Sequence, residues 1–99
     1  MNGLSSADAD EYARWFRCLA DGTRVRILSI IAAADGPLSV GEVVAAADRS
    51  QSTVSRHLQV LADDEFIRLH ADGTRTLVEV NTACMSALPD AAAAIMGRR

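Results

Sequence analysis

Lysine is absent from this chain of 99 residues, so all ten of its basic residues are arginine. They stand against 13 acidic residues and leave a net charge of −3. An acidic balance is unusual for a protein that binds nucleic acids through charge alone. Arginine, however, holds a phosphate or a guanine through two parallel hydrogen bonds. Any affinity for nucleic acid must therefore depend on where the arginines lie and on doubling in a dimer, and it should be sensitive to salt.

Long apolar runs and aromatic residues are also scarce. No stretch approaches the roughly 20 apolar residues that a membrane span needs, and the first residues lack the basic and apolar regions of an export signal. We therefore expect a cytoplasmic protein without a membrane partner. Aromatic residues make up 4% of a chain that is 49% hydrophobic, which is typical of a compact helical domain. We expect one domain over 1–99, with residues 1–6 disordered.

The most informative segment lies between Ser50 and Leu61. Val54, Leu58 and Leu61 are spaced as the apolar stripe of a helix. Its other face carries short or hydrogen-bonding side chains and no acid, namely Gln51, Ser52, Ser55, Arg56 and Gln59. Such side chains reach base edges and phosphates in a major groove. This segment therefore predicts a helix that contacts DNA, with Ser50 as its N-cap.

Three helices are expected before this segment. The first covers Ala7 to Ala20. The second begins after Asp21, its N-cap, with Val25, Leu28 and Ile31 as its buried edge, widened by Ile27 and Ile30, while Arg24 and Arg26 face elsewhere. The third follows Ser39, which can cap it. The third and fourth helices would form a helix-turn-helix. After them the pattern alternates around 72–73, an Asp-Gly pair that is a strong hairpin signal. The fold class is thus mainly α with a small β-hairpin.

An apolar, alanine-rich tail over 81–96 is expected to be helical again, with Pro89 kinking it or opening a second short helix. Little core remains for such a tail to join. An interface with a second copy of the chain is its most economical use, together with the aromatic stripe of the first helix.

Two stretches resemble the ArsR/SmtB family of metal-responsive repressors. Residues 19–28 (LADGTRVRIL) are similar to the opening signature of that family, and 50–61 to its recognition helix. The hairpin at 72–75 matches the family's wing, and the resemblance covers roughly positions 12 to 80. It implies a winged helix-turn-helix repressor, homodimeric through its first and last helices, that binds a palindromic operator in double-stranded DNA.

The resemblance also assigns roles by position. Bases would be read by Gln51, Ser52, Ser55 and Arg56. Contacts with the phosphate backbone would come from Arg49, Thr53, His57, Arg68 and Arg75.

The usual metal sites of the family are missing. Ser39 and Gly41 stand where many members carry two cysteines, and no histidine follows His70. The remaining candidates are the two cysteines, Cys18 and Cys84. Because the first and last helices would meet across the dimer, Cys18 of one subunit is predicted to face Cys84 of the other. Two thiolates would take a thiophilic inducer such as Hg(II), arsenite or Cd(II).

Other interpretations stay open. The same cysteines could form a disulfide as a redox switch, or they could merely pack as small apolar side chains. A winged helix used only for contact with proteins would carry acids or exposed apolar residues on the fourth helix, which this chain does not. An enzyme is not expected, because no supported catalytic constellation or phosphate-binding loop is found.

Overall fold

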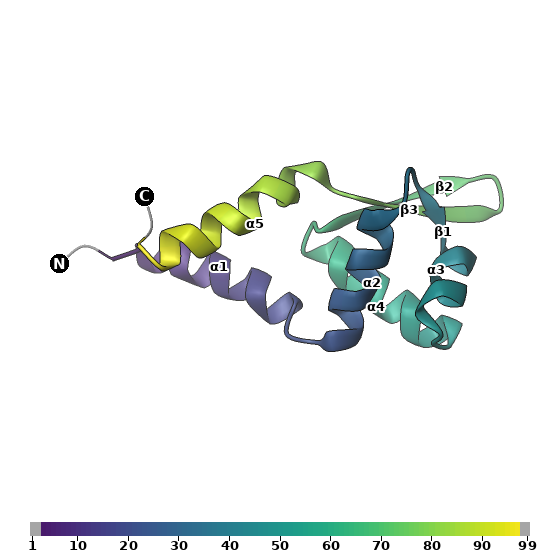
Figure 1. The fold of residues 1–99 in the computed structure, drawn as a ribbon, viewed down its shortest axis with the longest axis horizontal. Helices are drawn as coiled ribbons and strands as arrows, with labels where there is room; N and C mark the ends of the chain where they lie inside the picture. Colours follow the sequence, from purple (N-terminus) through teal and green to yellow (C-terminus); the bar gives the residue numbers. More distant parts are fainter. Residues whose placement is uncertain (1–2, 98–99) are drawn as a thin grey trace.

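The computed structural model describes residues 3–97, which form five helices and three short strands (Figure 1). In chain order the elements are α1 (Ser6–Cys18), α2 (Gly22–Ala33), β1 (Leu38–Ser39), α3 (Val40–Ala47), α4 (Gln51–Asp63), β2 (Ile67–Asp72), β3 (Arg75–Val80) and α5 (Thr82–Ile95). This order of elements confirms the predicted winged helix-turn-helix.

Short polar side chains begin the helices. Asp21 accepts a hydrogen bond from the backbone N–H of Arg24, and Ser50 accepts one from that of Thr53. Ser39 caps α3 with a complete capping box, in which the carboxylate of Glu42 accepts a hydrogen bond from the backbone N–H of Ser39. These caps satisfy N–H groups that a helix start leaves free. All three were predicted as caps, and the structure confirms them.

The first helix begins earlier than expected, because Ser5 caps it and Ser6 already belongs to it. The disorder expected over 1–6 therefore does not extend to residues 5 and 6. Residues 1 and 2 of that segment lie outside the described part of the chain.

A compact core lies where α2, α3 and α4 pack against the sheet. Its most buried large side chains are Ile27, Val43, Val54, Leu58, Leu61, Ile67 and Val78. On α2 the buried edge is centred on Ile27 and Ile31, one helical turn apart, whereas Val25 is 47% exposed. The prediction that Val25 lies on the buried edge was wrong, since Ile27 points into the core and Val25 lies two residues, or about 200°, away.

The predicted hairpin is confirmed and has a third strand beside it. β2 and β3 pair antiparallel from Ile67 opposite Val80 to Asp72 opposite Arg75. The turn places Gly73 at φ +63°, a conformation that glycine adopts without strain. β1 adds Leu38 and Ser39 opposite Val78 and Leu77, giving the order β1-β3-β2. A two-residue strand has no sequence signal of its own, so β1 was not predicted.

Two helices project from this body. In Figure 1, α1 and α5 reach toward the same end, away from α3 and the wing, and the molecule is 53 Å long. α5 is one continuous helix with Pro89 inside it, so the proline does not open a second helix. Large apolar side chains of these two helices and their ends remain exposed, namely Phe16, Met85, Ile95 and Met96. Within residues 3–97, every helix is too short or too polar to span a bilayer.

Candidate nucleic-acid interface

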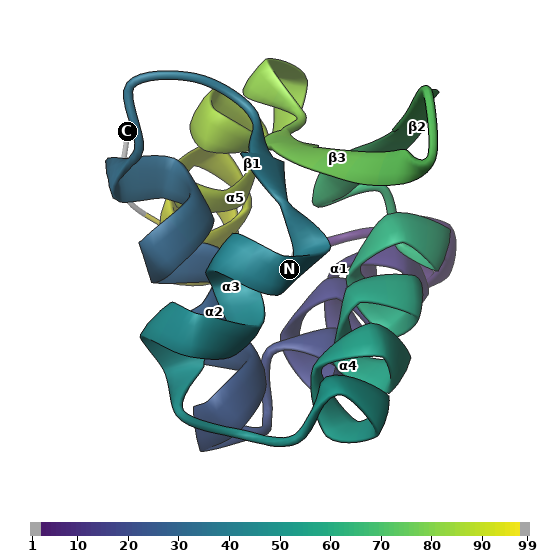
Figure 2. The ribbon, with the colours of Figure 1, turned by 90° about the vertical axis from the view of Figure 1, so that its right-hand side faces the viewer.

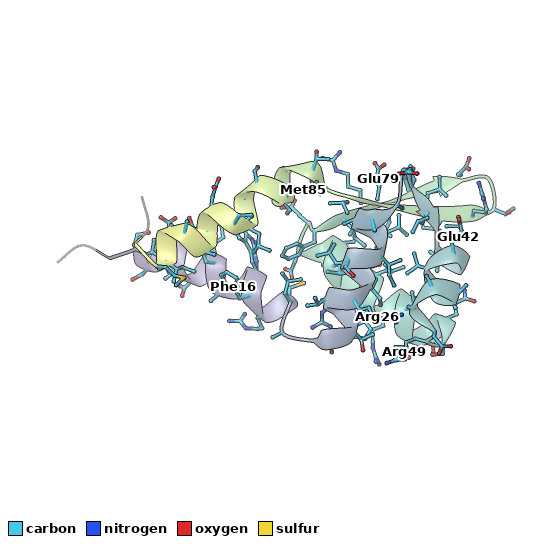
Figure 3. The ribbon with its side chains drawn as sticks, viewed as in Figure 1. Phe16, Arg26, Glu42, Arg49, Glu79 and Met85 are labelled. Carbon is cyan, nitrogen blue, oxygen red and sulfur yellow. The ribbon has the colours of Figure 1, made fainter. Side chains whose placement is uncertain are left out.

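An arginine of α2 stabilises the turn between α3 and α4 through two hydrogen bonds. Nη1 of Arg26 donates to the carbonyl oxygen of Ala47 at 2.6 Å, and Nη2 donates to that of Ala46 at 3.1 Å. Figure 3 shows Arg26 directed toward the turn that contains Arg49. These carbonyls end α3 and have no partner within the helix. Arg26 therefore fixes the C-terminus of α3, from which the chain turns into α4.

The predicted reading face of α4 is exposed. Its members Gln51, Ser52, Ser55, Arg56 and Gln59 all lie on the surface, while Val54, Leu58 and Leu61 are at most 2% exposed. Figure 2 shows α4 at the side of the molecule below the β2–β3 wing. The helix thus presents hydrogen-bonding side chains outward without an acidic residue between 51 and 59.

The wing completes a groove at the start of α4. A hollow of about 420 Å³ lies between the start of α3, α4 and the hairpin. It is lined by Ser39, Val40, Gly41, Gln51, Ser55, Thr74, Arg75 and Thr76. The structure therefore brings two predicted base contacts, Gln51 and Ser55, together with the predicted phosphate contact Arg75. Arg75 is exposed and pairs with Asp72 at 3.1 Å.

Arg68 lies elsewhere. It lines a second, larger hollow of about 720 Å³ at the other end of α4, together with Gln59. Asp63, Glu65 and Glu79 also line that hollow. Three carboxylates repel phosphate, so this region is less suited to DNA than the groove beside Arg75.

Arg49 and Thr53 flank the start of α4. The guanidinium of Arg49 is exposed and donates to the carbonyl of Asp48 at 3.1 Å. Thr53 is half-buried, and its hydroxyl accepts a hydrogen bond from Ser50 at 2.9 Å. Arg49 is therefore open to a phosphate, whereas the hydroxyl of Thr53 already has a partner within the protein.

His57 departs from the prediction that it faces the phosphate backbone. Its side chain is 7% exposed and lies on the inner side of α4. Nδ1 of the ring is 3.1 Å from Nη1 of Arg24 on α2. A buried ring that contacts α2 is not available to a phosphate. No local pattern indicates this contact, because Arg24 and His57 are 33 positions apart.

Cys18 is buried at the end of α1. Its side chain is 4% exposed, and Sγ is 4.0 Å from the carbonyl oxygen of Val60 on α4. Burial, followed by a hydrogen bond and repulsion from Asp64, raises the pKa of the Cys18 thiol to about 11. Cys18 is therefore a protonated thiol within the core of its own subunit at neutral pH.

Cys84 is more accessible. It is half-buried near the start of α5, and its Sγ donates to the carbonyl oxygen of Glu65 at 3.0 Å. Burial, with a smaller contribution from Glu65, raises the pKa of this thiol as well. Both thiols thus contact the segment from Val60 to Glu65 that joins α4 to β2. Among residues 3–97, no group of three or more histidine, cysteine or acidic side chains could hold a metal ion.

The arginines of α2 are the contacts that sequence reasoning missed. Arg24 and Arg26 were expected merely to face away from the buried edge of that helix. The structure places Arg24 between α1 and α4, and Arg26 under the end of α3. Their partners are mostly backbone carbonyls, which leave no pattern in a sequence.

Comparison with known proteins agrees with this arrangement. A family described as a helix-turn-helix domain matches residues 19–70. The HTH-type transcriptional regulator Rv2034 of Mycobacterium tuberculosis is 36% identical over 75 residues, which are 76% of this chain and 68% of that protein. A probable mercury resistance operon repressor of Streptomyces lividans is 39% identical over 66 residues, which are 67% of this chain and about half, 51%, of that protein.

A solved structure extends the likeness to nearly the whole chain. The winged helix-turn-helix DNA-binding domain of Mb0332 from Mycobacterium bovis, a possible ArsR-family regulator described as homodimeric, is 29% identical with a TM-score of 0.70. The match covers 94% of this chain and 90% of that domain. These relatives are described as transcriptional regulators and not as enzymes, in agreement with the expectation from the sequence. The chain therefore belongs to the ArsR family of winged helix-turn-helix transcriptional regulators.

Proposed function

We propose that this protein is a homodimeric repressor that binds a palindromic operator through α4 and acts in the cytoplasm. One observation carries the proposal: the exposed face of α4 is made of hydrogen-bonding side chains without an acid, beside the groove that holds Arg75. A face meant for another protein would carry exposed apolar or acidic residues.

The base contacts follow from side-chain chemistry. Arg56 suits a guanine, whose N7 and O6 accept two parallel hydrogen bonds, and Gln51 suits an adenine. Ser52 and Ser55 are small enough to let the helix approach the groove floor. Arg49 and Arg75 contact the phosphate backbone. Thr53 contributes less because its hydroxyl already accepts from Ser50, and Arg68 contributes less because carboxylates surround it.

The dimer rests on α1 and α5. Phe16 of α1 and Met85 of α5 (Figure 3) are exposed apolar side chains, as are Ile95 and Met96 at the end of α5. A surface of this kind favours association with a second copy. A twofold axis there would place two copies of α4 in successive major grooves, about 34–36 Å apart.

Fluorescence anisotropy with labelled DNA from upstream of the gene tests the proposal. We expect tight, salt-sensitive binding by the wild type, and a loss of about tenfold or more for Arg56→Gln, because a bidentate base contact contributes about 1–3 kcal/mol. Gln51→Ala should weaken binding to the same DNA as well. Arg17→Gln, the same change on the exposed surface of α1, is the matched control and should bind as the wild type does. Operator affinity that survives both α4 substitutions would assign this face to protein contacts instead.

A second proposal concerns the signal. We propose that a thiophilic ion, Hg(II), arsenite or Cd(II), releases the operator by binding Cys18 and Cys84 of opposite subunits. The relation to a probable mercury resistance operon repressor supports a response to metal, and two thiolates suit linear Hg(II) best among these ions. Cys18 would have to leave its place against Val60, so binding would pull the end of α1 away from α4.

The same anisotropy assay separates the candidate signals. Hg(II), arsenite, Cd(II), Zn(II) and peroxide are added one at a time to the reduced protein on DNA, with Cys18→Ser and Cys84→Ser as variants. Release by one ion that is lost in both variants supports the two-cysteine site. Release by peroxide, with a dimer on a non-reducing gel, identifies a redox switch. Binding that responds to none of them leaves the cysteines as packing residues and overturns the metal proposal.

A further inference from the structure

One guanidinium joins the end of α1 to the reading helix. Arg24 lies in the first turn of α2, and its Nε donates to the carbonyl oxygen of Cys18 at 2.6 Å. Its Nη1 lies 3.1 Å from Nδ1 of His57 on α4. Arg24 is partly buried and His57 almost fully buried, so water competes little for either bond.

The chemistry of the pair fixes the state of the ring. A guanidinium has only donors, so Nδ1 of His57 must be the acceptor and carry no proton. The ring is then neutral, with its proton on Nε2. A positively charged imidazole would lose this bond and bring two cations together.

The position of His57 gives this bond its importance. His57 follows Arg56 directly in α4, so the bond reaches the helix beside a residue of the reading face. Two further contacts between α1 and α4 lie nearer the end of α4: Cys18 against Val60, and Arg14 with Asp64 at 3.7 Å between Nε and Oδ1. A displacement of α1 therefore reaches the reading residues most directly through Arg24.

We propose that Arg24 is a positioning residue that transmits the position of α1 to the reading face of α4. This inference rests on the proposed function, because it concerns how α4 is presented to DNA. With both bonds intact, α4 is held in the orientation that fits the operator. When the end of α1 moves, the link through Arg24 breaks and operator affinity falls.

The first test compares operator affinity near neutral pH. Arg24→Gln should weaken binding about tenfold, in line with couplings of 0.5–2 kcal/mol for residues that link two sites. Arg24→Lys keeps the charge but cannot make both bonds, so it should fall in between and covers the case in which Arg24→Gln does not fold. Arg17→Gln serves again as the control for lost charge. Equal affinity for wild type and both Arg24 variants would overturn the inference.

Replacement of the acceptor provides a readout that a merely structural role would not move. The substitution His57→Asn supplies a neutral acceptor near the position of Nδ1, so it should bind operator DNA as the wild type does. A loss of affinity in His57→Asn as large as that in Arg24→Gln would contradict the proposal.

Nitrogen chemical shifts of the imidazoles separate this inference from the function on which it rests. We expect His57 of the free wild type to show the Nε2–H tautomer, and Arg24→Gln to change it. If the wild type does not bind operator DNA, the proposed function fails whatever the tautomer. If it binds but His57 is not held as this tautomer, the role of Arg24 fails alone.

Discussion

At the scale of single residues, the buried thiol of Cys18 ties stability to alkaline pH. Its ordinary pKa of 9.0 is raised to about 11 in the folded protein. Folding therefore favours the protonated thiol. Stability from this group is fully present below about pH 9 and is lost as the pH rises toward 11, because the unfolded chain ionises first.

We expect the free energy of unfolding to fall by about 2–3 kcal/mol over that interval through Cys18, at about 1.4 kcal/mol for each pH unit. Urea unfolding of the wild type, Cys18→Ala and Cys84→Ala at several pH values measures this. The fall should be shallower in Cys18→Ala, while Cys84→Ala should keep the part due to Cys18. Equal slopes in the wild type and Cys18→Ala would show that the thiol is not held protonated.

At the scale of elements, α3 depends on its capping box. Oγ of Ser39 accepts from the backbone of Glu42 at 3.1 Å, and the carboxylate of Glu42 accepts from the backbone of Ser39 at 3.0 Å. This bond from the Ser39 backbone holds the pKa of Glu42 below its ordinary value. A helix of eight residues gains little from internal hydrogen bonds alone, so its cap should weigh heavily.

We expect Ser39→Ala to cost about 1 kcal/mol of unfolding free energy, since it leaves an N–H of the first turn without its partner. Urea unfolding near neutral pH checks the value. Ser86→Ala, at an exposed serine within α5, is the matched control and should change stability little. A cost shared equally by both variants would argue against the cap.

Elements whose causes are local could be predicted from the sequence. Asp21 and Ser50 act as caps because each bonds to an N–H three residues ahead, and the Asp-Gly pair makes its turn from its own backbone. The reading face of α4 was predicted for the same reason, since helical periodicity alone decides what faces outward. Local pattern thus accounts for most of the fold and for the centre of the candidate site.

Features that depend on distant partners were not predicted. His57 fits the polar face of α4 by its type, yet Arg24 holds it inside. β1 exists only because β3 is there to pair with it. The contact of Cys18 with Val60 likewise depends on α4, 42 residues further along the chain. In each case the deciding contact is tertiary, and one sequence does not reveal it.

At the scale of the whole molecule, the exposed apolar side chains of α1 and α5 form the proposed dimer interface. Met85, within α5, is 62% exposed, and Met96, the C-cap of α5, is 83% exposed. A carboxylate buried in an apolar interface lacks compensation for its lost hydration. We expect Met85→Glu to raise the dissociation constant of the dimer by about tenfold or more.

Sedimentation equilibrium measures this constant. The control is Ala45→Glu, which puts the same charge on the exposed surface of α3, at the opposite end of the molecule from the tips of α1 and α5 (Figure 1). It should leave the dimer intact. Dissociation by Ala45→Glu but not by Met85→Glu would move the interface away from α5.

The contact of Cys18 with Val60 has a consequence for kinetics. A thiol sealed between two helices reacts with an alkylating reagent only in the moments when α1 lifts from α4. The ratio of the labelling rate of Cys18 to that of the more accessible Cys84 therefore measures how often these openings occur in the native protein, without any denaturant. Operator DNA should lower the labelling rate of Cys18 if it favours the state in which α1 and α4 are joined. An inducer should raise this rate.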